Sequence, residues 1–105
     1  MKPESILRLE KEFGVELKLV EYNEDFFNWK YTNSYQLNED YEIIGLDLTA
    51  NAIKNISFLK DFQYLNYLYL NNNEILDIEV LKYLQHLRVL LLSDNQILDL
   101  DALKD

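Results

Sequence analysis

The chain has 105 residues, and its 19 acidic and 10 basic side chains give a formal net charge of −9. A chain of this length forms one domain or part of one. Nucleic acids and anionic membranes bind basic surfaces, so the charge argues against both and is compatible with a basic protein partner. Cysteine is absent, which excludes a disulfide framework and thiol chemistry. We find no signal peptide and no apolar stretch long enough to span a membrane, so we expect a cytoplasmic protein.

Residues 1–42 are predicted to form an N-terminal cap that contains a helix, a strand and a hairpin. The segment PESILRLEKEF (3–13) favours a helix with Ile6, Leu9 and Phe13 on one face, and Gly14 suits its C-terminal end. Apolar residues alternate with charged ones over 15–19, which indicates a short strand. Alternation over 31–37, a turn at NED (38–40) and the apolar segment that follows predict a hairpin.

Aromatic residues gather in the loop between the predicted strand and hairpin. Phe26, Phe27 and Trp29 either pack the cap onto the rest of the fold or form an exposed anchor for a partner. We expect the packing role.

From residue 43 onward the sequence repeats itself every 22 residues. Apolar residues occupy positions 43, 46, 48, 53, 56, 59 and 62, then 65, 68, 70, 75, 78, 81 and 84, then 87, 90, 92, 97, 100 and 103. Asn51, Asn73 and Asn95 recur at the same interval. The first half of each unit alternates like a strand, and the second half has the spacing of a short helical turn. Asn55, Asp77 and Asp99 precede these turns, where a side-chain oxygen can accept hydrogen bonds from free amides.

These residues resemble the leucine-rich repeat family, specifically the 22-residue type of bacterial internalins and of a regulatory subunit of protein phosphatase 1. The segments that carry the resemblance are IIGLDLTANAIKNISFLKDFQY, LNYLYLNNNEILDIEVLKYLQH and LRVLLLSDNQILDLDALKD. The resemblance implies an α/β solenoid, with a parallel sheet on its concave face and short 3-10 or α turns on its convex face. It also implies that residues 43–105 form three repeats, the last without a C-terminal cap, and that 1–42 resemble the cap of bacterial leucine-rich repeat proteins. The internalin pattern usually has a proline in the helical half and a secretion signal, and this chain has neither.

The resemblance also implies that a partner binds the concave face. The predicted partner-binding residues are Asp47, Thr49, Tyr67, Tyr69, Asn71, Asn72, Val89, Leu91, Ser93 and Asp94, with Gly45 and Ala50 beside them. Their aromatic and apolar members would form an exposed patch, which usually marks an interaction site. The alternative is that they only stabilise the sheet through contacts between neighbouring strands. Asn51, Asn73 and Asn95 align with a structural asparagine ladder in the family.

Catalytic chemistry is not indicated. His86 has no cysteine to form a triad with, and the two glycines, Gly14 and Gly45, form no phosphate-binding loop. The spacing of Asp99, Asp101 and Asp105 suggests calcium, but the glycine and glutamate of an EF-hand loop are missing. We therefore expect no enzyme activity, no cofactor and no metal site.

The third repeat would have a neighbour on one side only. The chain is then a fragment of a longer solenoid, or self-associates through this edge, or is covered there by another protein. The predicted function is non-catalytic binding of a protein. The alternatives are an acidic immunity or antitoxin protein that neutralises a basic protein, and the N-terminal regulatory part of a multidomain protein such as a Roco-type GTPase.

Overall fold

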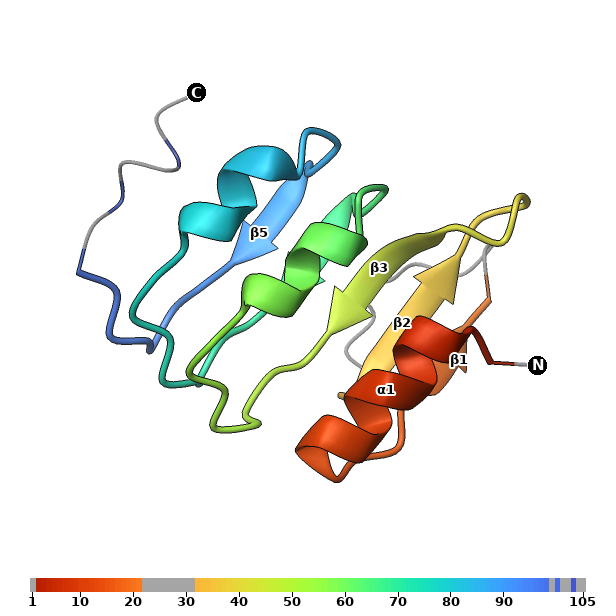
Figure 1. The fold of residues 1–105 in the computed structure, drawn as a ribbon, viewed down its shortest axis with the longest axis horizontal. Helices are drawn as coiled ribbons and strands as arrows, with labels where there is room; N and C mark the ends of the chain where they lie inside the picture. The colour runs from red at the N-terminus through yellow and green to blue at the C-terminus, as the bar shows by residue number, and fades with distance from the viewer. Residues whose placement is uncertain (1, 22–31, 99, 101–102, 104–105) are drawn as a thin grey trace.

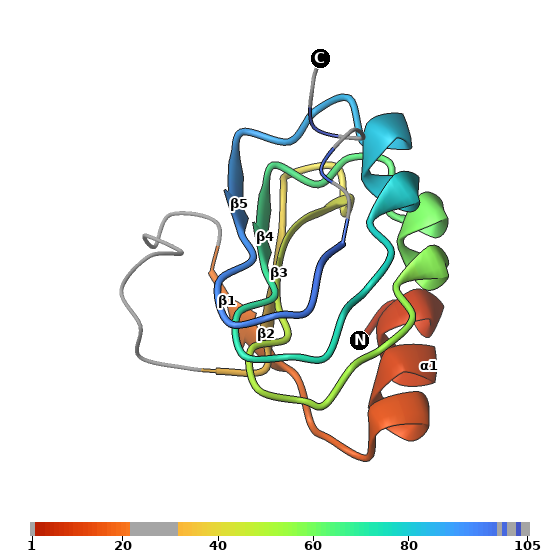
Figure 2. The same ribbon diagram turned by 90° about the vertical axis from the view of Figure 1, so that its left-hand side faces the viewer.

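The computed structural model describes residues 2–21, 32–98, 100 and 103. Strands form one layer and helical elements form the other, so that the helical elements cover one face of the sheet (Figures 1 and 2). In chain order the elements are α1 (Glu4–Phe13), β1 (Lys18–Val20), β2 (Ser34–Leu37), β3 (Ile43–Asp47), the 3-10 helix η2 (Ser57–Asp61), β4 (Tyr67–Tyr69), the 3-10 helix η3 (Glu79–Tyr83) and β5 (Val89–Leu91).

The strands form one five-stranded sheet in the order β1-β2-β3-β4-β5. β1 runs parallel to β2, β2 runs antiparallel to β3, and β3, β4 and β5 are mutually parallel. Gly45 pairs with Tyr67 and Tyr67 pairs with Val89, so paired residues in these strands are 22 positions apart. The prediction of an α/β fold with a mainly parallel sheet is confirmed.

The N-terminal region packs α1 beside the first strands. Gly14 ends the helix with φ +66°, a left-handed conformation that glycine adopts without strain, and its amide donates to the Glu10 carbonyl. The strand predicted within 15–19 begins only at Lys18. The reason is local, because the amide of Leu17 donates to the Glu10 carboxylate at 2.7 Å and its side chain is buried in the core. The loop predicted after this strand contains Phe26, Phe27 and Trp29, which lie outside the described residues.

The core lies between the two layers, where equivalent side chains of successive repeats stack. Its members from the first two repeats include Leu46, Leu48, Ile53, Ile56, Leu59, Leu65, Leu68, Leu70, Ile75 and Ile78. The predicted side-chain bonds at the turns are confirmed for two of three residues: Asn55 accepts from the Ser57 amide at 2.8 Å and Asp77 from the Glu79 amide at 2.9 Å. Asp99 lies outside the described residues.

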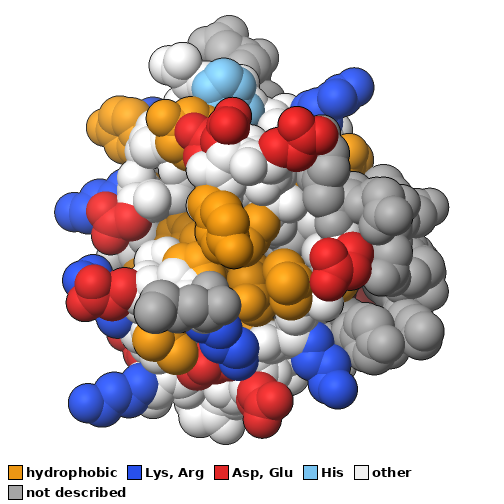
Figure 3. Space-filling view, turned by 90° about the vertical axis from the view of Figure 1, so that its right-hand side faces the viewer, with side chains coloured by type: hydrophobic (Ala, Val, Ile, Leu, Met, Phe, Trp, Pro, Cys, Tyr) orange, Lys and Arg blue, Asp and Glu red, His pale blue; other side chains and the backbone are white. Residues whose placement is uncertain are grey.

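The two ends of the molecule differ. At the end formed by α1, β1 and the β2–β3 hairpin, hydrophobic side chains gather at the centre of the surface with charged ones around them (Figure 3). At the β5 end, Leu87, Leu90, Leu92 and Ile97 are only partly buried.

Among the described residues, no helix is long and apolar enough to cross a membrane.

Candidate interaction surface

The sheet has an outer face, turned away from the helical elements, and this is the face that the resemblance predicts to be concave. Side chains alternate between the two faces along a strand. The outer face therefore carries Gly45 and Asp47 from β3, Tyr67 and Tyr69 from β4, and Val89 and Leu91 from β5. The register of the sheet places Asp47, Tyr69 and Leu91 side by side in one row across three strands.

Two residues predicted to contact a partner are buried, and their prediction as accessible positions is wrong. Tyr69 is 1% exposed and Asp47 is 4% exposed. Tyr69 forms a second buried cluster with Val20 of β1, and Tyr67, Val89 and Leu91 pack against it. The outer face thus has a small hydrophobic cluster of its own, and Tyr69 belongs to its interior.

The Asp47 carboxylate is held by Thr49, two residues later in the chain. Its Oδ1 accepts from the Thr49 amide at 3.0 Å and from the Thr49 hydroxyl at 2.7 Å. Burial raises the pKa of this carboxyl above its usual range, and the two hydrogen bonds from Thr49 oppose the rise. Asp47 is therefore a buried polar residue of the sheet and is not accessible to a partner. Gly45 beside it is buried too.

The accessible part of the outer face lies over β4 and β5 and the loops that follow them. Tyr67, Val89 and Leu91 are half-buried, and each presents part of an apolar or aromatic side chain to solvent. Asn72, Ser93 and Asp94 are exposed at its border, as is Ala50 in the first repeat, while Thr49 is half-buried. We call Tyr67, Val89, Leu91, Asn72, Ser93 and Asp94 the β4–β5 surface.

Asn71 is also engaged within the fold. Its Oδ1 accepts from the Ser93 amide at 2.7 Å and from the Ser93 hydroxyl at 2.8 Å. These bonds join the second repeat to the third, so the side-chain oxygen that sequence reasoning assigned to a partner already has two donors.

Of the three repeating asparagines, Asn73 and Asn95 bond to the backbone of a neighbouring coil as well as to their own. Asn73 accepts from the amides of Asn51 and Ile53 and donates to the carbonyls of Leu48, Leu70 and Asn71. Asn95 accepts from Ile75 and donates to Leu70, Leu92 and Ser93. Asn51 donates to the Asn33 side chain and to the Thr49 carbonyl. Each side chain thus satisfies backbone groups where the chain leaves a strand.

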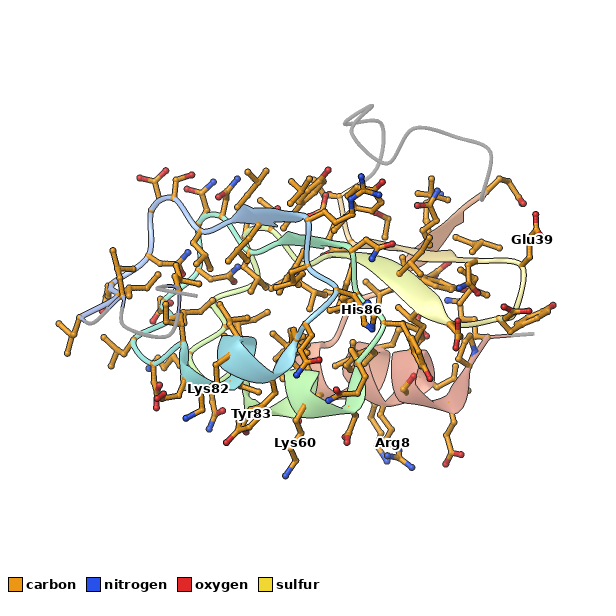
Figure 4. The ribbon with its side chains drawn as sticks, turned by 90° about the horizontal axis from the view of Figure 1, so that it is seen from above. Arg8, Glu39, Lys60, Lys82, Tyr83 and His86 are labelled. Carbon is orange, nitrogen blue, oxygen red and sulfur yellow. The ribbon has the colours of Figure 1, made fainter. Side chains whose placement is uncertain are left out.

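Sequence reasoning missed an aromatic pair beside the sheet. Tyr64 and His86 occupy equivalent positions 22 residues apart, and their rings stack with centroids 6.1 Å apart. Tyr83 is also exposed, with the Lys82 ammonium 5.3 Å from its ring centroid. Figure 4 shows Lys82, Tyr83 and Lys60 pointing away from the sheet on the helical side. The shared 22-residue interval of Tyr64 and His86 was the signal that could have revealed the stack.

The His86 ring stacks on the ring of Tyr64, and the His86 carbonyl accepts from the Asn66 side chain at 2.9 Å. Within the described residues, no group of three or more His, Asp or Glu side chains is placed to hold a metal ion. Of the aspartates considered for calcium, Asp99, Asp101 and Asp105 all lie outside these residues.

Comparison with solved structures finds a likeness to an internalin. The structure is similar to that of an internalin from Listeria monocytogenes, with a TM-score of 0.59 and 31% sequence identity over 70% of this chain. The chain spans 24% of the length of that internalin chain. A scan against models of protein families matches none of them, and a search of curated proteins finds no match. The likeness agrees with the repeats and the register of β3, β4 and β5, and together they establish that the fold is of the leucine-rich repeat kind.

Proposed function

We propose that this chain is a non-catalytic module, built of three 22-residue repeats behind an N-terminal cap, that binds a protein through its β4–β5 surface. The observation that carries the proposal is that Tyr67, Val89 and Leu91 remain partly exposed on a sheet face that the helical elements do not cover. Apolar and aromatic side chains gathered at a surface are typical of protein interfaces. The leucine-rich repeat kind of fold supports a protein partner by analogy only.

The polar residues at the border fit the same role. Ser93 and Asp94 are exposed beside Leu91, and Asn72 occupies the equivalent place beside Tyr69. Asn72 and Asp94 have positive φ values of 57° and 59°, which hold the chain in a tight turn directly after the strand. An apolar centre with a polar rim is the usual arrangement of an interface.

The experiment is affinity capture with matched variants. We expect Tyr67→Ala combined with Leu91→Asp to abolish retention of a partner that the unmodified chain retains. Leu76→Asp is the control, because Leu76 is an equally large exposed side chain that precedes η3 on the helical side. Retention of the partner by the double variant, with an unchanged circular dichroism spectrum, would contradict the assignment of this surface.

The net charge of −9 favours a second candidate, an acidic protein that neutralises a basic one. In that case the association rate would fall steeply with salt, because long-range attraction between opposite charges is screened. Binding through the β4–β5 surface would depend weakly on salt and strongly on Leu91.

A further inference from the structure

A groove lies on the helical side of the molecule, where the end of α1 meets the first repeat. Its volume is about 470 Å³, which is within the range of cavities that hold ligands. We call it the α1–η2 groove, and its lining includes Glu12, Phe13, Ile53, Lys54, Phe58 and Lys60. Because both walls belong to described elements, the groove does not depend on where the sequence ends.

Aromatic rings form much of the apolar part of this groove. Phe13 and Phe58 pack edge to face with ring centroids 5.5 Å apart, and Phe58 packs in the same manner against Phe62 at 6.3 Å. Phe62 is buried, whereas Phe13 and Phe58 are half-buried and keep part of their surface in the groove. Phe58 is particular to the first repeat, since the equivalent residues are Val80 and Ala102. The first repeat therefore offers an aromatic contact that the other two lack.

Charged side chains of opposite sign line the two walls. Lys54 and Lys60 come from the first repeat, and Glu12 comes from α1. Lys60 forms no ion pair with a described residue, and the Lys54 ammonium lies 3.9 Å from a carboxylate oxygen of Glu74. The chain as a whole has 19 acidic and 10 basic residues, so an excess of cations in one groove runs against its overall charge.

Two neighbouring cavities on the helical side do not share this excess. Their volumes are about 320 and 170 Å³, and each is lined by two carboxylates and one cation. These residues are Lys54, Asp77 and Glu79 between η2 and η3, and Arg8, Glu12 and Asp61 in the smaller cavity beside Phe58. Of the three cavities, the α1–η2 groove is thus the one suited to a negatively charged ligand.

We propose that the α1–η2 groove binds an acidic peptide segment of a partner protein. One large apolar side chain of the segment packs against Phe13 and Phe58, and its carboxylates lie toward Lys54 and Lys60. The charge of the segment follows from the two lysines, which attract carboxylates and disfavour a basic segment. This site goes beyond the proposed function, because it lies on the helical side of the sheet and the β4–β5 surface lies on the other side.

Peptide titration followed by two-dimensional NMR tests the class of ligand. The probe is a pentapeptide with phenylalanine between two pairs of aspartates. We expect it to shift the amide signals of Asn55, Ser57 and Phe58 at millimolar concentration. Peptides with lysines in place of the aspartates, or alanine in place of phenylalanine, should bind roughly three-fold or more weakly. No binding of the acidic peptide, or tighter binding of the basic one, would overturn the proposal.

Charge variants of the chain test the location of the site. We expect Lys60→Glu to weaken binding of the acidic peptide roughly three-fold or more, because repulsion replaces attraction, and Glu12→Gln to strengthen it. Lys82→Glu is the matched control, because it makes the same change at the equivalent position of η3, outside the groove (Figure 4). Equal weakening by Lys60→Glu and Lys82→Glu would overturn the assignment. The Tyr67→Ala, Leu91→Asp double variant should still bind the peptide, so failure of this site is distinguishable from failure of the β4–β5 surface.

Discussion

The second and third repeats have nearly the same apolar residues at the same spacing, yet they are buried to very different degrees. Leu65, Leu68, Leu70 and Ile75 are all 0% exposed, whereas their equivalents Leu87, Leu90, Leu92 and Ile97 are only partly buried. The second repeat has a coil on each side and the third has a described neighbour on one side only. Burial in this fold is therefore decided by the neighbours of a coil and not by its own sequence.

The largest difference between the two repeats should appear at their central leucines. We expect Leu68→Ala to lower the free energy of unfolding by about 2–5 kcal/mol, because it leaves a cavity in a fully buried site. Leu90→Ala should lower it by less than half as much, because water already reaches its side chain. Urea unfolding of dilute protein, followed by circular dichroism, measures both values. Equal losses would mean that the third repeat is as well packed as the second.

The sequence predicted which residues face the core but not how far each is buried. The 22-residue interval placed Leu68 and Leu90 in equivalent inward positions, and both indeed face inward. Their unequal burial depends on the coil beside them, which no pattern within a repeat encodes.

The outer face shows the same limit of sequence reasoning. Alternation assigned Tyr69 and Leu91 to this face, but the burial of Tyr69 arises from a cluster with Val20, which is 49 positions earlier in the chain. Sequence reasoning did not foresee that Tyr69 is only 1% exposed. The repeat contained no information on what the N-terminal region places against it.

The asparagines provide a second comparison of the two repeats. The Asn73 side chain is buried and makes five hydrogen bonds to described residues, whereas the Asn95 side chain is half-buried and makes four to described residues. We expect Asn73→Ala to destabilise the protein by about 1–3 kcal/mol, because it leaves buried backbone groups unpaired. Asn95→Ala should have a smaller effect, because solvent can replace part of what is lost. Thermal unfolding of both variants checks the order, and a larger effect at Asn95 would contradict it.

In the row formed by Asp47, Tyr69 and Leu91, the first repeat contributes Asp47. The buried carboxyl of Asp47 makes the stability of the fold depend on pH. Burial raises the folded-state pKa of Asp47 above its unfolded value, so protonation favours the folded state. Ionised Asp47 therefore destabilises the fold at neutral pH, and this penalty disappears as the pH falls below the unfolded value.

Asp47→Asn removes the charge and keeps an oxygen that can accept from Thr49. We expect the variant to have a higher Tm than the unmodified chain at pH 7, with the difference shrinking as the pH is lowered through the range in which aspartate titrates. Asp94→Asn is the matched control, because it makes the same substitution at an exposed position. A Tm difference at Asp47 that does not vary with pH would contradict the assigned cause.

The smallest expected effect lies at the junction between the two repeats. The Ser93 hydroxyl donates to Asn71 from an exposed position, and the Ser93 amide donates to the same oxygen. Ser93→Ala removes the first bond and keeps the second, so we expect a change of less than about 0.5 kcal/mol in the free energy of unfolding. Asn71→Ala removes both acceptor contacts and should destabilise more. If Ser93→Ala proved as damaging as Asn71→Ala, the hydroxyl and not the amide would hold the third repeat to the second. The position of the third repeat would then depend on a bond that solvent can reach.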